Sequence, residues 1–396
     1  MSKLNDLIKE LCPDGVEYKP LDSFATIVRG NGLQKKDFTE DGVGCIHYGQ
    51  IYTYYGTYAY ETKSKVSVEL AETLKKVETG DLVVAVTSEN IEDVCKCVAW
   101  LGEETIVTGG HAAIIKHKQN SKYLAYYFQT EDFYKQKVKI VTGTKVMDIA
   151  PSKMGKIIIP IPPLPVQCEI VRILDNFTAL ISALISALTA ELTAQRKRYS
   201  GFLNSLLSFE GRGAQDGVLW KKLGDAVGIK RGVRVVKAQL NEVGEYPVYQ
   251  NSLTALGNYN YFNCNANKTF LITAGAAGEI GYSYVPFWAA DDCYYFECND
   301  SGLMERYLYY ALKTRQYKLK RMVRNASVPR LGRYSIENLL IPVPSLEEQQ
   351  RIVDILDRFD KLCNDLSEGL PAEIAARQKQ YEYYRDKLLT FNEKKA

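Results

Sequence analysis

The sequence has little of what metal and thiol chemistry require. Its three histidines, His47, His111 and His117, are not placed to complete a zinc site, and its nine cysteines include no C-x-x-C pair. Zinc sites usually combine such ligands at short spacings, so we expect no bound metal. The chain also opens without the charged and apolar segments of a secretory signal. A cytoplasmic protein with reduced cysteines is therefore the expectation.

Recognisable catalytic motifs are absent as well. The sequence contains neither the G-x-x-x-x-G-K-[ST] phosphate loop of ATPases nor the Asn/Asp-Pro-Pro-Tyr/Phe motif of amino-methyltransferases. Pro13-Asp14, followed by Glu17 and Lys19, superficially resembles a nuclease motif, but its carboxylates are too close in sequence to come from two separate strands. Without a nucleophile–base pair or a metal cluster, we expect a protein that is not itself an enzyme.

A long hydrophobic run and a strong net charge are also missing. The most apolar stretch, residues 177–192, is interleaved with Ser and Thr and is too short to span a membrane, so we assign it to a buried helix face. The net charge of +3 excludes a uniformly basic nucleic-acid coat and leaves local patches for any DNA binding. Tyrosine is abundant, with 28 copies against 13 of phenylalanine, and it suits half-buried strands and wet binding surfaces.

The clearest positive feature is an internal repeat. Residues 159–177, IPIPPLPVQCEIVRILDNF, match residues 341–359, IPVPSLEEQQRIVDILDRF, without a gap. The segments in front of these blocks correspond more loosely, with Gly30, for example, matching Gly232. The order is therefore variable domain, helix block, variable domain, helix block. Such an order is expected when two domains read different things and the blocks share one structural task.

Each helix block begins with an I-P-x-P segment, which must be extended because proline cannot donate a helical hydrogen bond. Apolar residues then recur at steps of three and four over residues 170–192 and 352–366, a spacing typical of coiled-coil-like pairing. A helix of about 40 residues is roughly 60 Å long, and Gly369-Leu-Pro371 predicts a kink or a short break in the second helix. Two ordinary core helices within one large domain are the alternative.

We therefore predict an α+β fold in which two α/β-mixed domains are separated by two long antiparallel, coiled-coil-like helices, with a pseudo-twofold internal repeat. The predicted divisions are residues 1–158 for the first domain, 159–210 for the first Pro-rich lead-in and helix, 211–340 for the second domain, and 341–396 for the second lead-in and helix. Within the domains we predict strands at residues 81–86 and 269–273, and helices near residues 122–137 and 304–322.

Each variable domain ends in a basic run. Residues 306–334 contain nine Lys and Arg, and residues 135–156 contain six with Asp148 as the only acid. Basic stripes of this kind neutralise phosphates and make DNA binding salt-dependent, although a solvated helix face is the alternative. Each run also contains a small polar loop, residues 142–146 and 325–330, of a kind that reaches base edges in a groove.

Loop residues that recur at matching places in the two repeats are the candidate DNA contacts, because polar and basic side chains on loops carry most base and phosphate contacts. In the first domain the candidates are Arg29, Lys35, Lys36, Gln50, Ser88, Asn90, His111, Thr144 and Lys145. In the second domain they are Lys230, Arg231, Arg234, Tyr249, Gln250, Asn251, Arg324, Asn325, Ser327, Arg330 and Arg333.

The repeated I-P-x-P-x-L-x-x-Q-x-x-I-V-x-I-L-D-x-F block and the stretch 369–391 resemble the specificity subunits of type I restriction-modification systems, over essentially the whole chain. The resemblance implies two target-recognition domains, each reading one half of a bipartite double-stranded DNA site. It also implies that this chain binds no cofactor. Two modification subunits would use S-adenosylmethionine to methylate adenine, and restriction subunits would use ATP and Mg²⁺ to cleave DNA.

The first helix block departs from the pattern, because Pro165-Val-Gln-Cys168 stands where the second block has Glu347-Glu-Gln-Gln350. The two docking surfaces for modification subunits are therefore not expected to be equal. We place docking at the late helical turns, on Arg198, Tyr199, Phe202, Tyr381, Tyr384 and Arg385. Two other functions stay open: a specificity module of a combined methyltransferase–nuclease system, and a coiled-coil adaptor that binds only protein partners.

Overall fold

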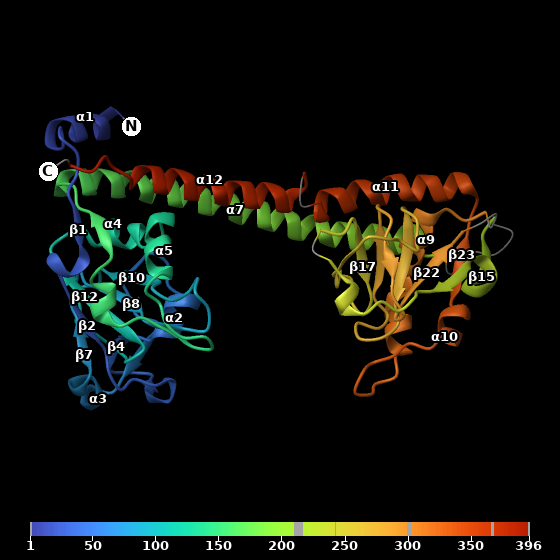
Figure 1. Cartoon of the computed structure of the whole chain (residues 1–396), viewed down its shortest axis with the longest axis horizontal. Coiled ribbons are helices and arrows are strands. Elements are labelled where there is room, and N and C mark those ends of the chain that lie inside the picture. Colours follow the sequence, from blue (N-terminus) through green and yellow to red (C-terminus); the bar gives the residue numbers. More distant parts are fainter. Residues whose placement is uncertain (1, 210–216, 242, 299–301, 366–367, 395–396) are drawn as a thin grey trace. The chain divides into compact units, whose positions relative to one another are not determined.

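The structure is a computed structural model that describes residues 2–209, 217–241, 243–298, 302–365 and 368–394. The chain folds into two compact units, which are labelled by element in Figure 1. Unit 1 comprises residues 1–186 and 375–396, and unit 2 comprises residues 187–374. Each unit therefore contains one variable domain and a part of each helix block. The unit boundaries lie inside the helices, not at the starts of the Pro-rich lead-ins.

Unit 1 is built on two β-sheets, with strand orders β2-β12-β8-β10-β5 and β3-β6-β4-β11-β7. The first sheet contains β2 (Ala25–Arg29), β12 (Ala112–His117), β8 (Leu82–Ala85), β10 (Cys97–Trp100) and β5 (Tyr58–Ala59). The second contains β3 (Phe38–Thr39), β6 (Ser64–Val66), β4 (Val43–Ile46), β11 (Ile106–Thr108) and β7 (Lys75–Val77). The remaining elements of the domain are α1 (Ser2–Leu11), η1 (Leu21–Ser23), η2 (Lys35–Asp37), α2 (Tyr48–Thr53), α3 (Val68–Thr73), β9 (Thr87–Ser88), α4 (Ser121–Tyr127), α5 (Glu131–Val138), β13 (Met147–Asp148) and α6 (Pro151–Met154).

The first sheet of unit 1 is covered on both faces. Leu82 and Val84 of β8 pack with Tyr123 and Phe133 of helices α4 and α5, while Val83 packs with residues of the second sheet. All four residues of β8 are buried, which is why this strand is a continuous apolar run rather than an alternating one. The predicted strand at residues 81–86 is confirmed.

Unit 2 repeats this layering with fewer strands. Its sheets have the orders β16-β22-β19-β20 and β18-β17-β21. One face of the larger sheet, through Leu271 and Phe296, packs with Tyr307 of α9 (Glu305–Arg321), and the other, through Phe270 and Ile272, packs on the smaller sheet. The other elements are β15 (Leu219–Lys222), α8 (Leu223–Ala226), β16 (Gly228–Arg231), η4 (Lys237–Gln239), β17 (Tyr246–Tyr249), β18 (Gly257–Tyr259), β19 (Lys268–Ile272), β20 (Ile280–Ser283), β21 (Trp288–Ala289), β22 (Cys293–Glu297) and α10 (Arg333–Glu337).

The predicted helices of the domains differ in one respect from the structure. The helix at residues 304–322 is confirmed as α9, but the one at residues 122–137 is divided into α4 and α5. Thr130 causes the division, because its hydroxyl accepts a hydrogen bond from the backbone N–H of Phe133 at 3.2 Å. Threonine is a preferred N-cap residue, and here it begins a new helix.

The Pro-rich lead-ins are extended, as predicted. β14 (Ile158–Pro160) pairs antiparallel with β1 (Tyr18–Pro20), and β23 (Leu340–Val343) pairs antiparallel with β15. The first helix block forms one long helix, α7 (Leu164–Leu207). The second forms α11 (Leu346–Asn364) and α12 (Leu370–Leu388), so that the predicted break precedes Pro371; residues 366–367 lie outside the described chain.

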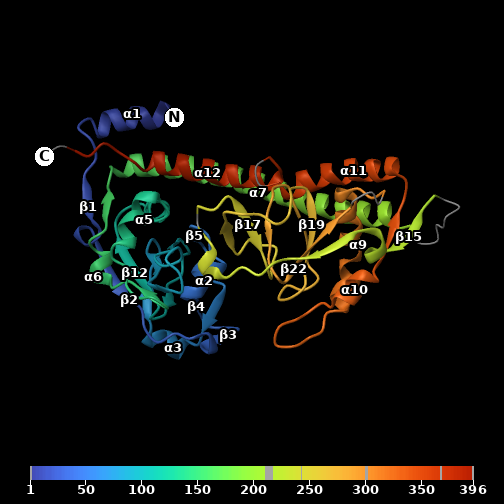
Figure 2. The same cartoon turned by 45° about the vertical axis from the view of Figure 1, so that its right-hand side comes forward.

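The helices pair antiparallel within each unit, as Figures 1 and 2 show. In unit 1, Phe177 of α7 contacts Tyr381 and Tyr384 of α12, with ring centroids 5.6 and 5.7 Å apart. In unit 2, Phe202 at the other end of α7 stacks on Phe359 of α11 at 5.1 Å. Because Phe359 is the repeat counterpart of Phe177, and Phe202 that of Tyr384, the same aromatic contact holds the helices together in both units.

The prediction that residues 177–192 form a buried helix face is wrong. These residues are half-exposed or exposed, and Leu180 is 70% exposed, because one partner helix covers only one side of α7.

The argument that this stretch is too short to span a membrane also fails. By length and composition alone, α7 is able to cross one, since an 18-residue window reaches a mean hydropathy of 1.6 and none of it is buried. One such helix is only a weak indication of a membrane span.

A buried glutamine anchors each domain to its helix block. Gln167 donates a hydrogen bond from Nε2 to the carbonyl of Pro162 at 2.8 Å, and its Oε1 accepts from the backbone N–H of Asn120 at 2.9 Å. Gln349 makes the same pair of bonds in unit 2, to Pro344 at 2.9 Å and from Met304 at 2.8 Å. Both side chains are fully buried, so satisfied amide groups explain this repeated glutamine.

A cation also joins each domain to its helix block. In unit 1, Lys122 donates to Asp175 at 2.9 Å. In unit 2, Arg306 donates from Nε to Asp357 at 2.7 Å and from Nη2 to Asp360 at 2.8 Å. Arg306 also lies against the rings of four tyrosines, Tyr282, Tyr284, Tyr309 and Tyr310, at 4.5–5.2 Å. We name Arg306, Asp357 and Asp360 the Arg306 clamp.

We expect acid to destabilise unit 1 through His117. Burial lowers the pKa of this imidazole, whose buried Nε2 has no partner among the described residues. The unfolded chain, in which histidine has a pKa of about 6.5, therefore binds more protons. The contribution of His117 to the free energy of unfolding is present above that pH and is lost as the pH falls toward the lower pKa of the folded state.

Urea unfolding at pH 7.5 and pH 5.5 measures this effect. The loss of stability between the two pH values should be smaller in His117→Gln, which cannot be protonated, than in the unaltered chain. An equal loss in both proteins would show that His117 does not contribute.

Candidate nucleic-acid interface

A groove of about 720 Å³ in unit 1 brings together five of the predicted DNA contacts. We name it the unit 1 groove; its lining comprises Lys35, Phe38, Tyr48, Gly49, Gln50, Tyr52, Thr53, Lys63, Ser64, Thr87, Ser88, Glu89, Asn90, Asp93, His111 and Val146. Predicted contacts from four separate segments thus face one hollow. The size and the mixed polar and aromatic lining suit a surface that reads base edges.

Three of the predicted contacts build the wall of this groove. Gln50 is 8% exposed, accepts a hydrogen bond from the backbone N–H of His47 at 3.1 Å and donates to Ser64 at 2.6 Å. Ser88 is 7% exposed, and the side chain of Asn90 is bonded twice to Asp93, at 2.8 and 2.9 Å. Their polar atoms are largely used inside the unit, and DNA contact by these three residues stays a prediction.

His111 and Lys35 are better placed to meet a ligand. The Nδ1 atom of His111 lies 2.8 Å from the hydroxyl of Thr87, and its ring lies 4.8 Å from that of Tyr48. The histidine is exposed, so its second ring nitrogen is available to donate or accept a bond. Lys35 and its neighbour Lys36 are exposed on η2.

The structure adds groove residues that the sequence did not single out, notably Tyr52 and Lys63. Tyr52 donates a hydrogen bond to the carbonyl of Thr87, and burial raises its pKa above the ordinary value. Lys63 lies 4.5 Å from the ring of Tyr54. Neither residue has a recognised counterpart in the second repeat, so the repeat comparison contained no signal for them.

The predicted polar loop of unit 1 is a closed hairpin. Thr142 and Asp148 exchange backbone hydrogen bonds at 3.0 and 2.8 Å, which leaves Thr144 and Lys145 exposed at the tip. Gly143 has φ +105° and a Cβ there would lie 2.0 Å from the carbonyl oxygen of Val146, so this turn requires glycine. The small polar residues of this loop therefore form a tight hairpin that projects into solvent.

Unit 2 contains the same hairpin at the corresponding place. Arg324 and Arg330 exchange backbone hydrogen bonds at 2.8 and 3.1 Å, and Asn325 and Ser327 are exposed between them. Arg324 and Arg330 are the counterparts of Thr142 and Asp148, because the same shift in residue number that aligns the two helix blocks also aligns these positions. The two predicted loops are thus the same structural element with different side chains.

The other predicted contacts of unit 2 are engaged to different degrees. Tyr249 is half-buried and stacks on Phe270 at 4.6 Å, and burial raises its pKa, so it belongs mainly to the core. The polar candidates form weak or local contacts: Lys230 with Glu297 at 3.7 Å, Gln250 with Asp291 at 3.3 Å, and Arg333 with Glu337 at 2.7 Å. Arg234 and Asn251 are exposed.

Part of the predicted basic runs does not reach the surface, which corrects the phosphate-binding interpretation of those residues. Arg306 and Arg315 are 9% and 7% exposed and pack within unit 2. Lys137 is 5% exposed and donates to the backbone carbonyls of Glu92 and Val94 at 3.1 and 2.8 Å. Buried cations need such internal partners, so these charges stabilise the domains. In the part of the chain that the structure describes, no group of three His, Cys, Asp or Glu is arranged to hold a metal ion.

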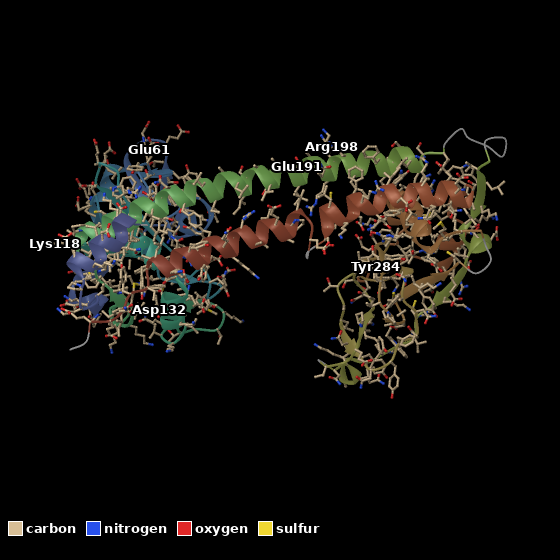
Figure 3. All side chains as sticks on the ribbon, turned by 90° about the horizontal axis from the view of Figure 1, so that it is seen from above. Glu61, Lys118, Asp132, Glu191, Arg198 and Tyr284 are labelled. Atoms are coloured by element: carbon tan, nitrogen blue, oxygen red, sulfur yellow. The ribbon has the colours of Figure 1, made fainter. Side chains whose placement is uncertain are left out.

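The predicted docking residues also divide into buried and exposed ones. Tyr381 and Arg385 are 8% and 7% exposed within unit 1, and Tyr199 packs against the core of unit 2. Phe202 and Tyr384 remain 43% and 41% exposed. Arg198 projects from α7 away from α11, as Figure 3 shows. Docking on these residues stays a prediction, with the exposed ones as its best candidates.

Comparison with known proteins identifies related chains of similar length. A putative type I restriction enzyme specificity subunit from Haemophilus influenzae is 29% identical over 398 residues, which cover 95% of this chain and 96% of that protein. The solved S subunit of a type I restriction-modification system from M. genitalium superimposes with a TM-score of 0.53 at 16% identity, covering 95% and 96% of the two chains. A chain from a structure of type I R-M complex assembly gives 0.68 at 17% identity, covering 95% and 97%. The structural matches establish the fold.

A family model described as the type I restriction modification DNA specificity domain matches the chain twice, over residues 13–194 and residues 217–376. The first match covers the variable domain of unit 1 and the second that of unit 2, each with the first part of its helix block. This division agrees with the repeated hairpins, glutamine anchors and helix contacts. The chain belongs to the family of type I restriction-modification DNA specificity domains and carries two copies of the domain.

Proposed function

We propose that this chain is the DNA-specificity subunit of a type I restriction-modification complex, with unit 1 and unit 2 each reading one half of a bipartite site. The observation that carries the proposal is the double family match, one match for each unit. In each unit, an exposed hairpin closed by the same backbone bonds stands on the same sheet framework. Different side chains on one framework are what two readers of different sequences require.

In this proposal the helices dock two modification subunits, and the chain itself performs no chemistry. Phe202 and Tyr384, exposed on repeat-related positions of α7 and α12, are apolar anchors of the kind that dominate interfaces. S-adenosylmethionine would be bound by the modification subunits, and ATP with Mg²⁺ by restriction subunits that join them. Assembly and DNA binding would take place in the cytoplasm.

Mapping of methylated adenines tests the proposal. The chain is co-expressed with its neighbouring methyltransferase gene, and modified adenines are located genome-wide by single-molecule sequencing. We expect one bipartite motif, of which a single half changes when residues 1–158 are exchanged for those of a relative. A stable complex without any motif would overturn the DNA-reading function and favour the adaptor that binds only protein partners.

A further inference from the structure

The two units place an arginine at the same point of their frameworks. In unit 1, Arg29 ends β2 and donates from Nε to the carbonyl of Gly110 at 3.0 Å. In unit 2, Arg231 ends β16 and donates from Nε to the carbonyl of Asp291 at 3.1 Å. The strand pairings are also equivalent, since Arg29 faces Ala113 and Arg231 faces Tyr294. The two guanidinium groups therefore start from matching positions with matching backbone anchors.

The hairpins attach to these frameworks in the same way. Asp148 pairs with Thr87 in unit 1, and Arg330 pairs with Ala274 in unit 2. The residue after each hairpin extends this pairing by one more backbone hydrogen bond. The N–H of Ile149 donates to the carbonyl of Val86 at 3.0 Å in unit 1, and the N–H of Leu331 donates to the carbonyl of Thr273 at 2.8 Å in unit 2. Arg330 thus occupies in unit 2 the place that Asp148 occupies in unit 1.

This exchange reverses a charge beside a retained arginine. In unit 1, Arg29 donates from Nη2 to the carboxylate of Asp148 at 2.6 Å, so that the pair is neutral. In unit 2 the carboxylate is replaced by a second guanidinium. Among the described residues of unit 2, neither Arg231 nor Arg330 forms an ion pair, and both side chains are exposed.

Two acids, Asp291 and Asp292, lie near these arginines, but among the described residues neither forms an ion pair with Arg231 or Arg330. Asp292 is the counterpart of His111, because the carbonyl of each accepts the same backbone bond, from Val86 in unit 1 and from Thr273 in unit 2. Its neighbour Asp291, the counterpart of Gly110, binds Arg231 through its backbone carbonyl, and the Asp291 carboxylate accepts a hydrogen bond from Nε2 of Gln250 at 3.3 Å. In the part of the chain that the structure describes, Arg231 therefore lacks the carboxylate partner that Asp148 provides to Arg29.

We propose that Arg231 and Arg330 bind a backbone phosphate of DNA, which takes the place beside Arg231 that the Asp148 carboxylate takes beside Arg29. The inference rests on the proposed function and deepens it. A phosphate presents the same kind of anionic oxygen to a guanidinium as a carboxylate does, and arginine binds both in a forked, charge-assisted geometry. Unit 2 then has a phosphate contact that unit 1 lacks, because in unit 1 the guanidinium of Arg29 is already paired with Asp148.

Salt-dependent DNA binding by the full chain, assembled with its methyltransferase, measures this contact. The logarithm of the association constant falls with the logarithm of salt concentration by about 0.9 for each phosphate neutralised on duplex DNA. We expect Arg330→Ala to reduce the magnitude of the slope by about 1 while the methylated motif stays the same. Asp148→Ala should increase it by about 1, because it releases Arg29 for a phosphate. Lys237→Gln, which removes one exposed charge elsewhere in unit 2, should leave it unchanged.

A charge reversal separates this contact from misfolding. Arg330→Asp restores the arrangement of unit 1, so the variant should fold with unchanged thermal stability and still lose the contact. An unchanged slope in Arg330→Ala, or an equal loss in Lys237→Gln, would overturn the phosphate site. A methylated motif altered in one half would assign Arg330 to base reading instead and overturn it too. Absence of any motif with the unaltered chain would instead reject the proposed function itself.

Discussion

Replacing Arg306 with alanine is expected to lower the free energy of unfolding by about 3–5 kcal/mol, the cost of breaking a buried ion pair by removing one partner. The side chain is 10% exposed and holds Asp357 and Asp360, which are 43% and 20% exposed. Alanine would remove the charged donor from both carboxylates and from the hydroxyl of Tyr310, and would leave Asp357 with its bond from Tyr310 and Asp360 with its bond from Asn364. A thermal midpoint lower by roughly 10 °C, followed by circular dichroism, is the measurement.

Lys122 provides the matched comparison in unit 1. It pairs with one carboxylate, Asp175 at 2.9 Å, and with one ring, that of Tyr58 at 3.6 Å, so Lys122→Ala should cost less than Arg306→Ala. Arg306→Lys keeps the charge but loses the forked geometry and should fall between the unaltered chain and Arg306→Ala. Equal midpoints for Arg306→Ala and the unaltered chain would show that the Arg306 clamp does not stabilise unit 2.

Replacing His111 with alanine is expected to weaken recognition of one half-site about 10- to 100-fold and to leave the other half unchanged. The histidine is exposed at the unit 1 groove, and its ring is held by Thr87 and Tyr48. Loss of one oriented base contact typically costs about 1–3 kcal/mol of discrimination. Methylation of duplexes that vary one base at a time, by the assembled complex, identifies the position affected.

His117→Gln is the control for this experiment. His117 lies at the far end of β12 from His111 and is part of the domain interior, so its replacement should leave base preference unaltered. A uniform loss of methylation over all base substitutions in His111→Ala would indicate damage to folding or to phosphate binding. Unchanged preference at every position would remove His111 from the reading surface.

The repeat in the sequence predicted the helix blocks well because packing constrains them residue by residue. The positions that match at one offset, such as Gln167 with Gln349 and Phe177 with Phe359, make the same contacts in both units. A side chain that satisfies a buried amide or fills a helix interface cannot change without a cost of the order of 1 kcal/mol or more. The repeat therefore records those contacts directly.

The candidate site was predicted less completely, because charge and loop position do not reveal burial. Arg306, Arg315 and Lys137 lie in basic runs that suggest a DNA-binding surface, yet they are buried with internal partners. Gln50 and Ser88 line the groove, but both are largely buried and help to form its wall. Which face of a short helix points inward depends on the sheet behind it, and no local pattern of charged residues specifies that face.

By itself, the sequence determined that this protein has two repeats of one α+β plan, extended Pro-rich lead-ins and long helices whose apolar residues recur at steps of three and four. These features follow from local backbone geometry and from the spacing of apolar residues, both of which depend on residues close together in the sequence. Only the tertiary structure decided that Asp148 neutralises Arg29 while Arg330 leaves Arg231 without a carboxylate partner among the described residues. That difference depends on strands and hairpins far apart in sequence meeting at one edge, where the energy of a charge is set by its neighbours in space.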